Sequence, residues 1–217
     1  MSQERTQSFG KSLFLGDLRE ELIFPFPQPH LAEQKKLTAL LDEVRKLAKR
    51  TIDPRRIDAD AHIPDEVLAG LRELGIFGLL TQPQLGGAGF SLSATARVID
   101  LLGSFDSSVA MLVAVHLGFA VLAIQNFGTS EQRQRYLPRL SKGHSIGAFA
   151  VAEPLAGSDS AAIRTRAEPC PGGYRLTGTK IWVQNGELAD LLIVFAQMVV
   201  HRDGANLRCI SRWAGER

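Results

Sequence analysis

Cysteine is scarce in this chain of 217 residues: only Cys170 and Cys209 occur, and neither stands in a metal-ligand spacing. Two cysteines do not make a disulfide framework, so a reducing, intracellular setting fits best. The chain also lacks a charge imbalance, because 25 Lys and Arg residues nearly cancel 23 Asp and Glu residues and leave a net charge of +2. This balance gives no broad electrostatic footprint for nucleic acid.

The N-terminus lacks the usual targeting signals. Residues 1–12 contain neither the apolar segment of a secretory signal nor an Arg-rich amphipathic presequence. A mitochondrial location is therefore not supported by these residues. With 45% hydrophobic residues, the chain can still bury a core in one or two domains.

Residues 1–31 resemble an arm more than a core element. Apolar side chains are present, but prolines at positions 25, 27 and 29 prevent a regular helix. We expect the arm to pack over a helical domain. The alternative is that its apolar side chains contact a membrane.

Helical signals dominate from residue 33 to residue 140. Apolar residues recur at spacings of three and four in the first segment, Ser91 is a candidate N-cap, and Thr129 with Gln132 forms a candidate capping box. Ser107 or Ser108 is expected to open the fourth helix. The predicted helices are 33–50, one from Pro64 to about Gly75, 92–102, 109–127 and 130–140.

The helix expected at 109–127 has no charged residue. A membrane span needs roughly 20 mainly apolar residues, and the apolar run falls short, so we expect a buried central helix; a membrane helix is the less favoured alternative. His116 is interpreted as a satisfied core histidine, since no nucleophile or metal partner lies near it in sequence.

Strand signals follow the helices. We expect strands at 149–152, 161–168, 174–177, 180–184 and 191–196, with a turn at 171–173. Helices first and strands afterwards indicate an α+β protein, or two domains. The glycine-rich residues 85–90 have the wrong spacing for a dinucleotide fingerprint and are interpreted as a turn, so a Rossmann fold is not expected.

Two features of the strand region suggest a ligand surface. Small residues at 155–159 let a ligand approach backbone N–H groups. Trp182 falls on the more polar face of its predicted strand, where its ring can stack on a planar cofactor. The alternative is that Trp182 covers a neighbouring domain, and the pattern alone leaves both open.

The segments AEPLAGSD (152–159) and GTKIWVQNG (178–186) resemble the two flavin-contacting motifs of the acyl-CoA dehydrogenases, TEP-x-x-GSD and G-x-K-x-W-I-T/S-N-G. The resemblance runs from about Ser8 to Gln197, and the lead-in SFGKSLFLG is similar to the very-long-chain branch. It implies an α+β fold with a helical N-terminal domain followed by an antiparallel β domain. The implied division is 1–31 arm, 32–145 helical domain, 146–198 partial β domain and 199–217 aberrant or alternative tail.

The resemblance also implies an activity. Family members use FAD to remove hydrogens from the α and β carbons of a fatty acyl-CoA in β-oxidation, with electron-transfer flavoprotein or a similar acceptor as partner. A homo-oligomer, a peripheral membrane contact at most, and a mitochondrial (eukaryotic) or cytoplasmic (bacterial) location are implied as well. Small side chains at Ala114, Gly118 and Ala120 are expected to leave room for a long acyl chain.

By the same resemblance, a set of eight residues is expected to line the flavin: Phe149, Val151, Ala152, Gly157, Ser158, Trp182, Val183 and Gln184. Ser158 is also expected to approach the pantetheine arm of the substrate. Two positions depart from the motifs, since Ala152 replaces a threonine and Gln184 replaces a threonine or serine.

We assign no catalytic residue and no metal site in this sequence. The family's catalytic glutamate lies in a C-terminal helical bundle, and none of Glu153, Glu168 or Glu187 stands at its motif position; Glu153 is expected to have a local structural role. The chain is therefore expected to lack the catalytic C-terminal domain and to show little or no activity alone. The alternative is a non-catalytic interaction or assembly protein that retains part of the fold.

Overall fold

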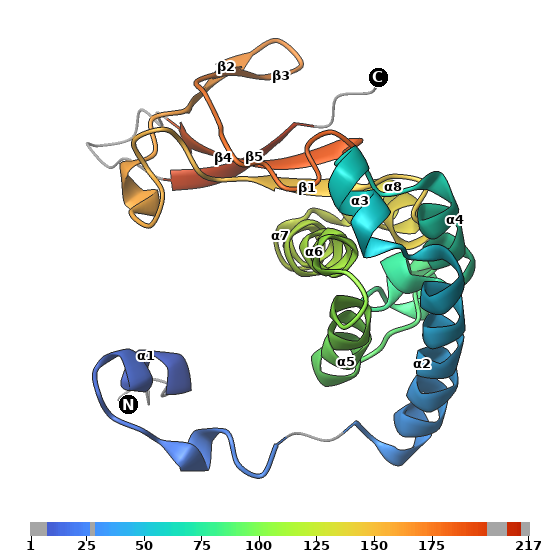
Figure 1. The fold of residues 1–217 in the computed structure, drawn as a ribbon. Helices are drawn as coiled ribbons and strands as arrows, with labels where there is room; N and C mark the ends of the chain where they lie inside the picture. Colours follow the sequence, from blue (N-terminus) through green and yellow to red (C-terminus); the bar gives the residue numbers. More distant parts are fainter. Residues whose placement is uncertain (1–7, 27–28, 199–207, 214–217) are drawn as a thin grey trace.

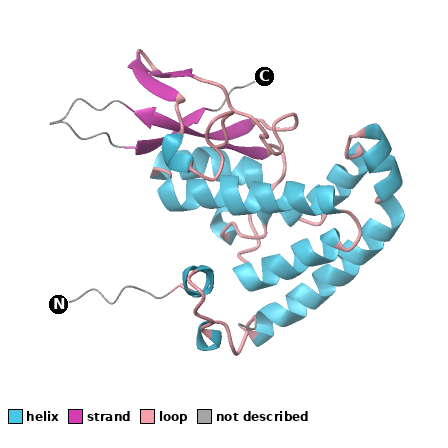
Figure 2. Cartoon of the chain, turned by 60° about the vertical axis from the view of Figure 1, so that its left-hand side comes forward, coloured by secondary structure: helices cyan, strands magenta, loops and turns pink. Residues whose placement is uncertain are grey.

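The computed structural model describes residues 8–26, 29–198 and 208–213 (Figure 1). A group of helices forms one side of the molecule, and a sheet lies against it on the other, as the second view shows (Figure 2). This arrangement confirms the α+β class predicted from the order of elements.

The helices follow the predicted ranges closely. Ser91 accepts a hydrogen bond from Ala94 N–H, and both bonds of the Thr129–Gln132 capping box are present. The fourth helix begins at Ser107, one of the two serines expected to open it, and Asp106 is its N-cap. The helices are α2 (Leu31–Thr51), α3 (Pro54–Asp60), α4 (Asp65–Glu73), α5 (Leu92–Gly103), α6 (Ser107–Val115), α7 (Leu122–Phe127) and α8 (Ser130–Ser141), with 3-10 turns η2 (Ile76–Gly78) and η3 (Pro83–Leu85).

The N-terminal arm contains the short helices α1 (Phe9–Phe14) and η1 (Glu20–Leu22). The expected packing over the helical domain is wrong for residues 8–26 of the arm: α1 and η1 bury no residue, and Phe14 is 93% exposed and Leu15 76%. α2, α4 and α5 bury most of their apolar side chains in the core that they share with the other helices. The arm extends away from the other helices (Figure 1).

Residues 107–127 form one continuous helix in which a π-helical turn, η4 (His116–Val121), joins α6 to α7. By length and composition this helix could cross a membrane, but 56% of its most apolar window is buried inside the protein. It contacts α5, α8 and the first strand. These contacts support the interpretation as a central helix.

The strands are β1 (Gly147–Ala150), β2 (Arg166–Cys170), β3 (Gly173–Thr177), β4 (Leu191–Met198) and β5 (Arg208–Trp213). The order across the sheet is β1-β4-β2-β3, and β5 also pairs with β4. The sheet is mixed and not antiparallel as expected, since β1 and β2 both run parallel to β4. Hairpin signals in the sequence identify the antiparallel β2–β3 pair, but parallel partners come from distant segments.

Three strand predictions need correction. The strand expected at 161–168 starts only at Arg166, because Asp159 caps a 3-10 turn, η5 (Ser160–Ala162), before it. Residues 180–184 form no regular strand, because Trp182 adopts a left-handed backbone with φ of 54° and interrupts the alternation. Strand β5 lies in the range 199–217, where few strand signals were found; its strand conformation comes with its pairing to β4, from Gln197↔Arg208 to Leu192↔Trp213. Positions 199–207 and 214–217 of the expected tail lie outside the described residues.

Candidate flavin-facing site

The free edge of β1 is covered by residues 180–185, which run beside it. The Ile181 N–H donates to Ala152 O at 3.0 Å, and Phe149 forms an isolated antiparallel bridge with Gln184. Because β4 pairs with the other side of β1, this segment supplies partners for backbone groups that an edge strand would otherwise leave free. We call residues 180–185 the edge segment.

A buried ion pair holds the first residue of the edge segment. Lys180 Nζ lies 2.8 Å from Glu153 Oε1 and also donates to Val151 O at 2.8 Å. The same carboxylate accepts from the Arg164 N–H at 2.6 Å and from the N–H and hydroxyl of Thr165. We call this set the charged clamp. It fastens both ends of the intervening small-residue loop and ties them to the edge segment.

The electrostatics of the charged clamp follow from its donors. Burial alone raises the pKa of the Glu153 carboxyl, but hydrogen bonds from Lys180, Thr165 and the Arg164 N–H outweigh it and lower the pKa from 4.5 to about 2. The carboxylate is therefore charged and fully engaged at neutral pH. This agrees with the local structural role expected for Glu153.

A second, uncharged cluster holds the last residue of the edge segment. Asn185 Nδ2 donates to Gly147 O at 3.1 Å and to Leu112 O at 3.0 Å. The Gly147 N–H donates to His116 Nδ1 at 3.1 Å, and His116 Nε2 lies 3.2 Å from Leu140 O. We call this set the neutral clamp. It joins the central helix, α8, β1 and the edge segment around the peptide groups of one glycine.

The partners of His116 fix its protonation state. Nδ1 faces an N–H and must accept, whereas Nε2 faces a carbonyl and must donate, so the ring is neutral with its proton on Nε2. Burial lowers the pKa of His116 from 6.5 to about 4, against the opposing effect of its backbone hydrogen bonds. The prediction of a satisfied core histidine is confirmed.

Close packing at Gly147 explains why a glycine stands at this joint. A Cβ built on Gly147 would lie 2.2 Å from the Cβ of Ala120, which is fully buried. Ala120 is therefore not available to line a tunnel, contrary to the expectation for it. Only a residue without a side chain allows β1 to approach the central helix this closely.

The eight residues expected to line a flavin fall into two groups. Four are exposed, namely Gly157, Ser158, Trp182 and Gln184, and four are partly buried, namely Phe149, Val151, Ala152 and Val183. The structure brings residues of the two motifs together along the edge of β1 through the Ile181–Ala152 and Lys180–Val151 hydrogen bonds. That these residues contact a flavin stays a prediction.

The exposure of Trp182 and Gly157 bears on ligand fit. Trp182 is 87% exposed, so its indole is not packed into the core. A Cβ added to Gly157 would meet nothing within 4 Å, and its φ is not in the left-handed region. Neither space nor backbone conformation within the described chain requires glycine at 157. A flat ring and an unobstructed backbone suit a planar ligand that approaches closely.

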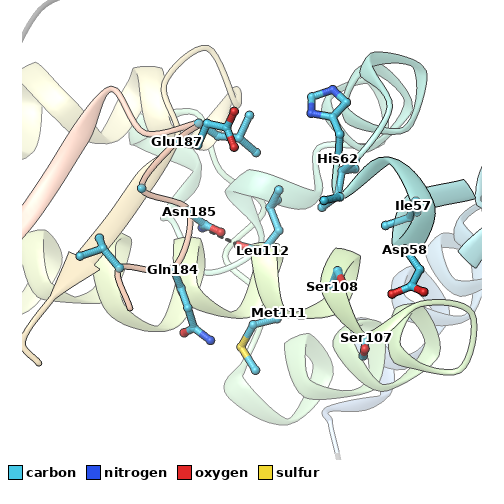
Figure 3. A pocket seen from close by; sticks show the side chains of 15 residues that line it. Ile57, Asp58, His62, Ser107, Ser108, Met111, Leu112, Gln184, Asn185 and Glu187 are labelled. Carbon is cyan, nitrogen blue, oxygen red and sulfur yellow. Dashed lines mark hydrogen bonds between the residues drawn. The ribbon is translucent and has the colours of Figure 1, made fainter. Parts of the chain in front are cut away.

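A groove runs beside the edge segment (Figure 3). It consists of a cavity of about 680 Å³ between α3, α6 and residues 183–188, and a second of about 480 Å³ between α5 and α6. Ser107 and Met111 line both cavities. We call the pair the α6 groove. Gln184 and Met111 lie toward one end of the first cavity, and His62 and Glu187 toward the other (Figure 3).

Sequence reasoning missed the residues that position this site. Lys180 and Asn185 were noticed only as motif letters, and Thr165 only as part of an alternating strand. For Asn185 a signal was available in the sequence, namely an asparagine at a fixed position of the motif. Asparagine tolerates a left-handed backbone, and Asn185 has φ of 62°. Within the described ranges, no group of three or more His, Cys, Asp or Glu side chains is placed to hold a metal ion.

Comparison with known protein families gives two matches. The sequence model of the acyl-CoA dehydrogenase N-terminal domain matches residues 34–144, and that of the acyl-CoA dehydrogenase middle domain matches residues 148–211. The second match extends beyond Gln197, where the resemblance was expected to stop.

Individual relatives agree with the family matches. A very-long-chain specific acyl-CoA dehydrogenase, mitochondrial, of Macaca fascicularis is 37% identical over 202 residues, covering 92% of this chain and 31% of the relative. A probable acyl-CoA dehydrogenase of Mycobacterium tuberculosis, FadE10, is 41% identical over 194 residues, covering 88% and 30%. The chain therefore spans somewhat under a third of the length of these relatives.

A solved structure shows the same fold. A glutaryl-CoA dehydrogenase from Mycobacterium smegmatis in complex with FADH2 matches with a TM-score of 0.69 and 31% identity, covering 76% of this chain and 43% of that chain.

Proposed function

The chain belongs to the acyl-CoA dehydrogenase family, and we propose that it supplies the flavin-facing and acyl-facing walls of an FAD-dependent enzyme that desaturates fatty acyl-CoA thioesters. The observation that carries the proposal is the edge segment, fastened at both ends by buried polar clamps, with an exposed tryptophan between them. An indole that is exposed to solvent adds little to the stability of the fold, whereas it offers a planar cofactor a surface on which to stack.

The residues present fit FAD. Trp182 offers an open ring face, and Gly157 and Ser158 offer exposed backbone on a loop held by the charged clamp. When bound, FAD supplies the two-electron acceptor that a dehydrogenation needs. In this chain, Trp182 stacks on the cofactor, the loop backbone hydrogen-bonds its edge, and the partly buried Phe149 and Val183 help exclude water.

Gln184 gives this site a donor of its own. Its exposed side chain lines the α6 groove near Met111 (Figure 3). The carboxamide can donate where the family motif carries a hydroxyl. The replacement of a hydroxyl residue by Gln184 therefore rearranges a hydrogen bond but keeps a donor at this position. The replacement of a threonine by Ala152 removes the side-chain donor altogether.

The α6 groove is proposed to take the acyl chain. The cavity between α5 and α6 is lined mainly by small side chains, including Gly103, Ser104, Ala110 and Ala114. Small residues along a helix leave depth for a ligand, so the groove suits a long chain better than a short one. Of the residues expected to make this room, Ala114 lines the groove.

No catalytic base is assigned to this chain. Glu153 is unsuited to the task because its oxygens are occupied by the clamp and its pKa is about 2, far below the optimum for a base at neutral pH. The wider assignment follows the family: a fatty acyl-CoA substrate, electron-transfer flavoprotein or a similar acceptor, a homo-oligomer, and an intracellular location that is mitochondrial in a eukaryote.

Flavin binding tests the proposal directly. FAD is titrated into the purified chain and followed by flavin fluorescence and by its visible spectrum. We expect saturable binding that Trp182→Ala weakens by about 10-fold or more, since a stacking surface is lost. Trp213→Phe is the matched control and is expected to leave binding unchanged. If the affinity for FAD is the same in Trp182→Ala as in the parent, the flavin binds elsewhere on the protein. If the parent binds no FAD, the non-catalytic interaction protein is favoured.

Chain-length preference tests the acyl wall. The double variant Ala110→Leu/Ala114→Leu fills the groove between α5 and α6, and we expect it to weaken palmitoyl-CoA binding by about 10-fold while butyryl-CoA binding changes little. The exposed Phe127→Leu is the control at the far end of the same helix. Equal losses for both thioesters would contradict the assignment of this groove to the distal acyl chain.

A further inference from the structure

Trp182 combines two features that rarely occur together. Its backbone is left-handed, with φ of 54°, and its side chain is 87% exposed. A left-handed conformation places Cβ close to the carbonyl oxygen, so bulky residues avoid it unless the surroundings enforce it. The exposed ring makes too few contacts with the described chain to compensate. The strain must therefore be imposed through the backbone on either side.

The two clamps stand where such a constraint is needed. Lys180, two residues before Trp182, is anchored to Glu153 and Val151. Asn185, three residues after it, is anchored to Gly147 and Leu112 and is itself left-handed. All the anchor groups belong to the central helix, to β1 or to the residues that directly follow β1.

The path between the anchors leaves little freedom. Ile181 N–H is bonded to Ala152 O at 3.0 Å, and Gln184 is bridged to Phe149. The Val183 carbonyl also accepts from the Gly186 N–H at 3.0 Å, so among the described residues Trp182 is the position of the edge segment for which no hydrogen bond of backbone or side chain is found. The turn needed to bring the chain from one anchored position to the other falls on residue 182.

We propose that Lys180 and Asn185 are positioning residues, which hold Trp182 in its strained conformation so that the indole is presented at a fixed place on the surface. That the presented ring serves a flavin rests on the proposed function; that the ring is held by the clamps does not. Residue 182 is then a position where stability and function conflict, because glycine fits the backbone better but offers no ring.

Paired substitutions measure the strain. Trp182→Ala removes the ring and keeps the strained backbone, whereas Trp182→Gly removes both. We expect the thermal midpoint of Trp182→Gly to lie about 2–4 °C above that of Trp182→Ala. The matched pair Glu187→Gly and Glu187→Ala, at an exposed turn position without positive φ, is expected to give the opposite order. The same order at both positions would overturn the inference.

Tryptophan fluorescence tests the clamps without any cofactor. In a Trp213→Phe background, Trp182 is the single tryptophan. We expect Asn185→Asp, which keeps size but removes the donors, to lower the emission anisotropy of Trp182. Lys180→Met is expected to do the same, and Lys180→Arg to keep the anisotropy of the parent.

A destabilised control separates positioning from general stability. Val98 lies in α5, belongs to neither the edge segment nor the clamps, and is fully buried, so Val98→Ala removes buried volume elsewhere in the core. We expect it to lower the thermal midpoint but leave the Trp182 anisotropy unchanged. An anisotropy that falls equally in Val98→Ala, or that does not fall in Asn185→Asp, would overturn the positioning role.

FAD titration in the same proteins keeps the two proposals distinguishable. We expect Asn185→Asp and Lys180→Met to weaken quenching of Trp182 by FAD by about 10-fold, while Val98→Ala binds like the parent. Absence of quenching in the parent refutes the proposed function alone, because the anisotropy differences are measured in FAD-free protein. Unaltered quenching in both clamp variants refutes the positioning role alone.

Discussion

The two clamps hold the same segment with opposite electrostatics. In the charged clamp, Glu153 is 7% exposed and keeps its charge because an ammonium, a hydroxyl and two N–H groups donate to it. In the neutral clamp, His116 is fully buried between one N–H and one carbonyl. A buried charge needs several donors, whereas a neutral ring needs one partner on each side. The supply of backbone partners thus decides which kind of group each place can hold.

The largest effect is expected when one half of the charged clamp is removed. Lys180→Met leaves the Glu153 carboxylate buried without its counter-ion, and the free energy of unfolding should fall by about 3–5 kcal/mol. Urea denaturation measures the loss. The double variant Glu153→Gln/Lys180→Met removes both charges and should recover part of it. A single variant as stable as the parent would mean that the ion pair is not desolvated.

Acid titration separates the clamps by pH. His116 has a folded pKa of about 4, below its ordinary 6.5, so the unfolded chain binds the proton first. Its stabilising contribution is complete above pH 6.5 and is lost as the pH falls toward 4, by about 3 kcal/mol in total. Glu153, lowered from 4.5 to about 2, follows in a second window from pH 4.5 downward.

Substitutions of His116 and Glu153 show which residue causes the loss of stability in each of the two pH ranges. Unfolding free energies are compared from pH 7 to 3 for the parent, His116→Gln and Glu153→Gln. We expect His116→Gln to flatten the upper window only and Glu153→Gln the lower window only. A parent whose stability does not change between pH 6.5 and 4 would contradict a neutral, fully buried His116.

Two glycines give the smallest and most selective comparison. Gly147→Ala places a Cβ 2.2 Å from Ala120 Cβ, and the resulting overpacking at the neutral clamp should lower stability by about 1–3 kcal/mol. Gly157→Ala, on the loop closed by the charged clamp, meets nothing within 4 Å and should leave stability nearly unchanged while it weakens FAD binding. Thermal unfolding and FAD titration together check both. Equal stability of the two variants would show that the joint at Gly147 adapts.

Local signals in the sequence were sufficient for the helices. The capping box at Thr129 and the cap at Ser91 act within three residues and were both predicted correctly. The short helix α3 was missed, although Asp53 followed by Pro54 is a start signal that the sequence contains. The strand predicted at 180–184 failed because alternation of side chains cannot reveal a left-handed residue.

Long-range partners account for what the sequence could not give. Lys180 and Asn185 could be located in a motif, but their roles depend on contacts 27 and 73 residues away in the chain. The arm shows the opposite error: its apolar residues suggested packing, yet Phe14 is exposed. The apolar composition of the arm indicates that burying its side chains is favourable, but it does not indicate which surface they would pack against.

The sequence by itself determined the helical segments, the hairpin and the family motifs, because caps, turns and periodicity act over a few residues. Only the tertiary structure decided that the sheet is mixed, that Glu153 is consumed by a clamp, and that Trp182 is turned outward from a strained backbone. Each of these depends on packing between distant segments, where the approach of β1 to the central helix at Gly147 sets which donors and acceptors meet.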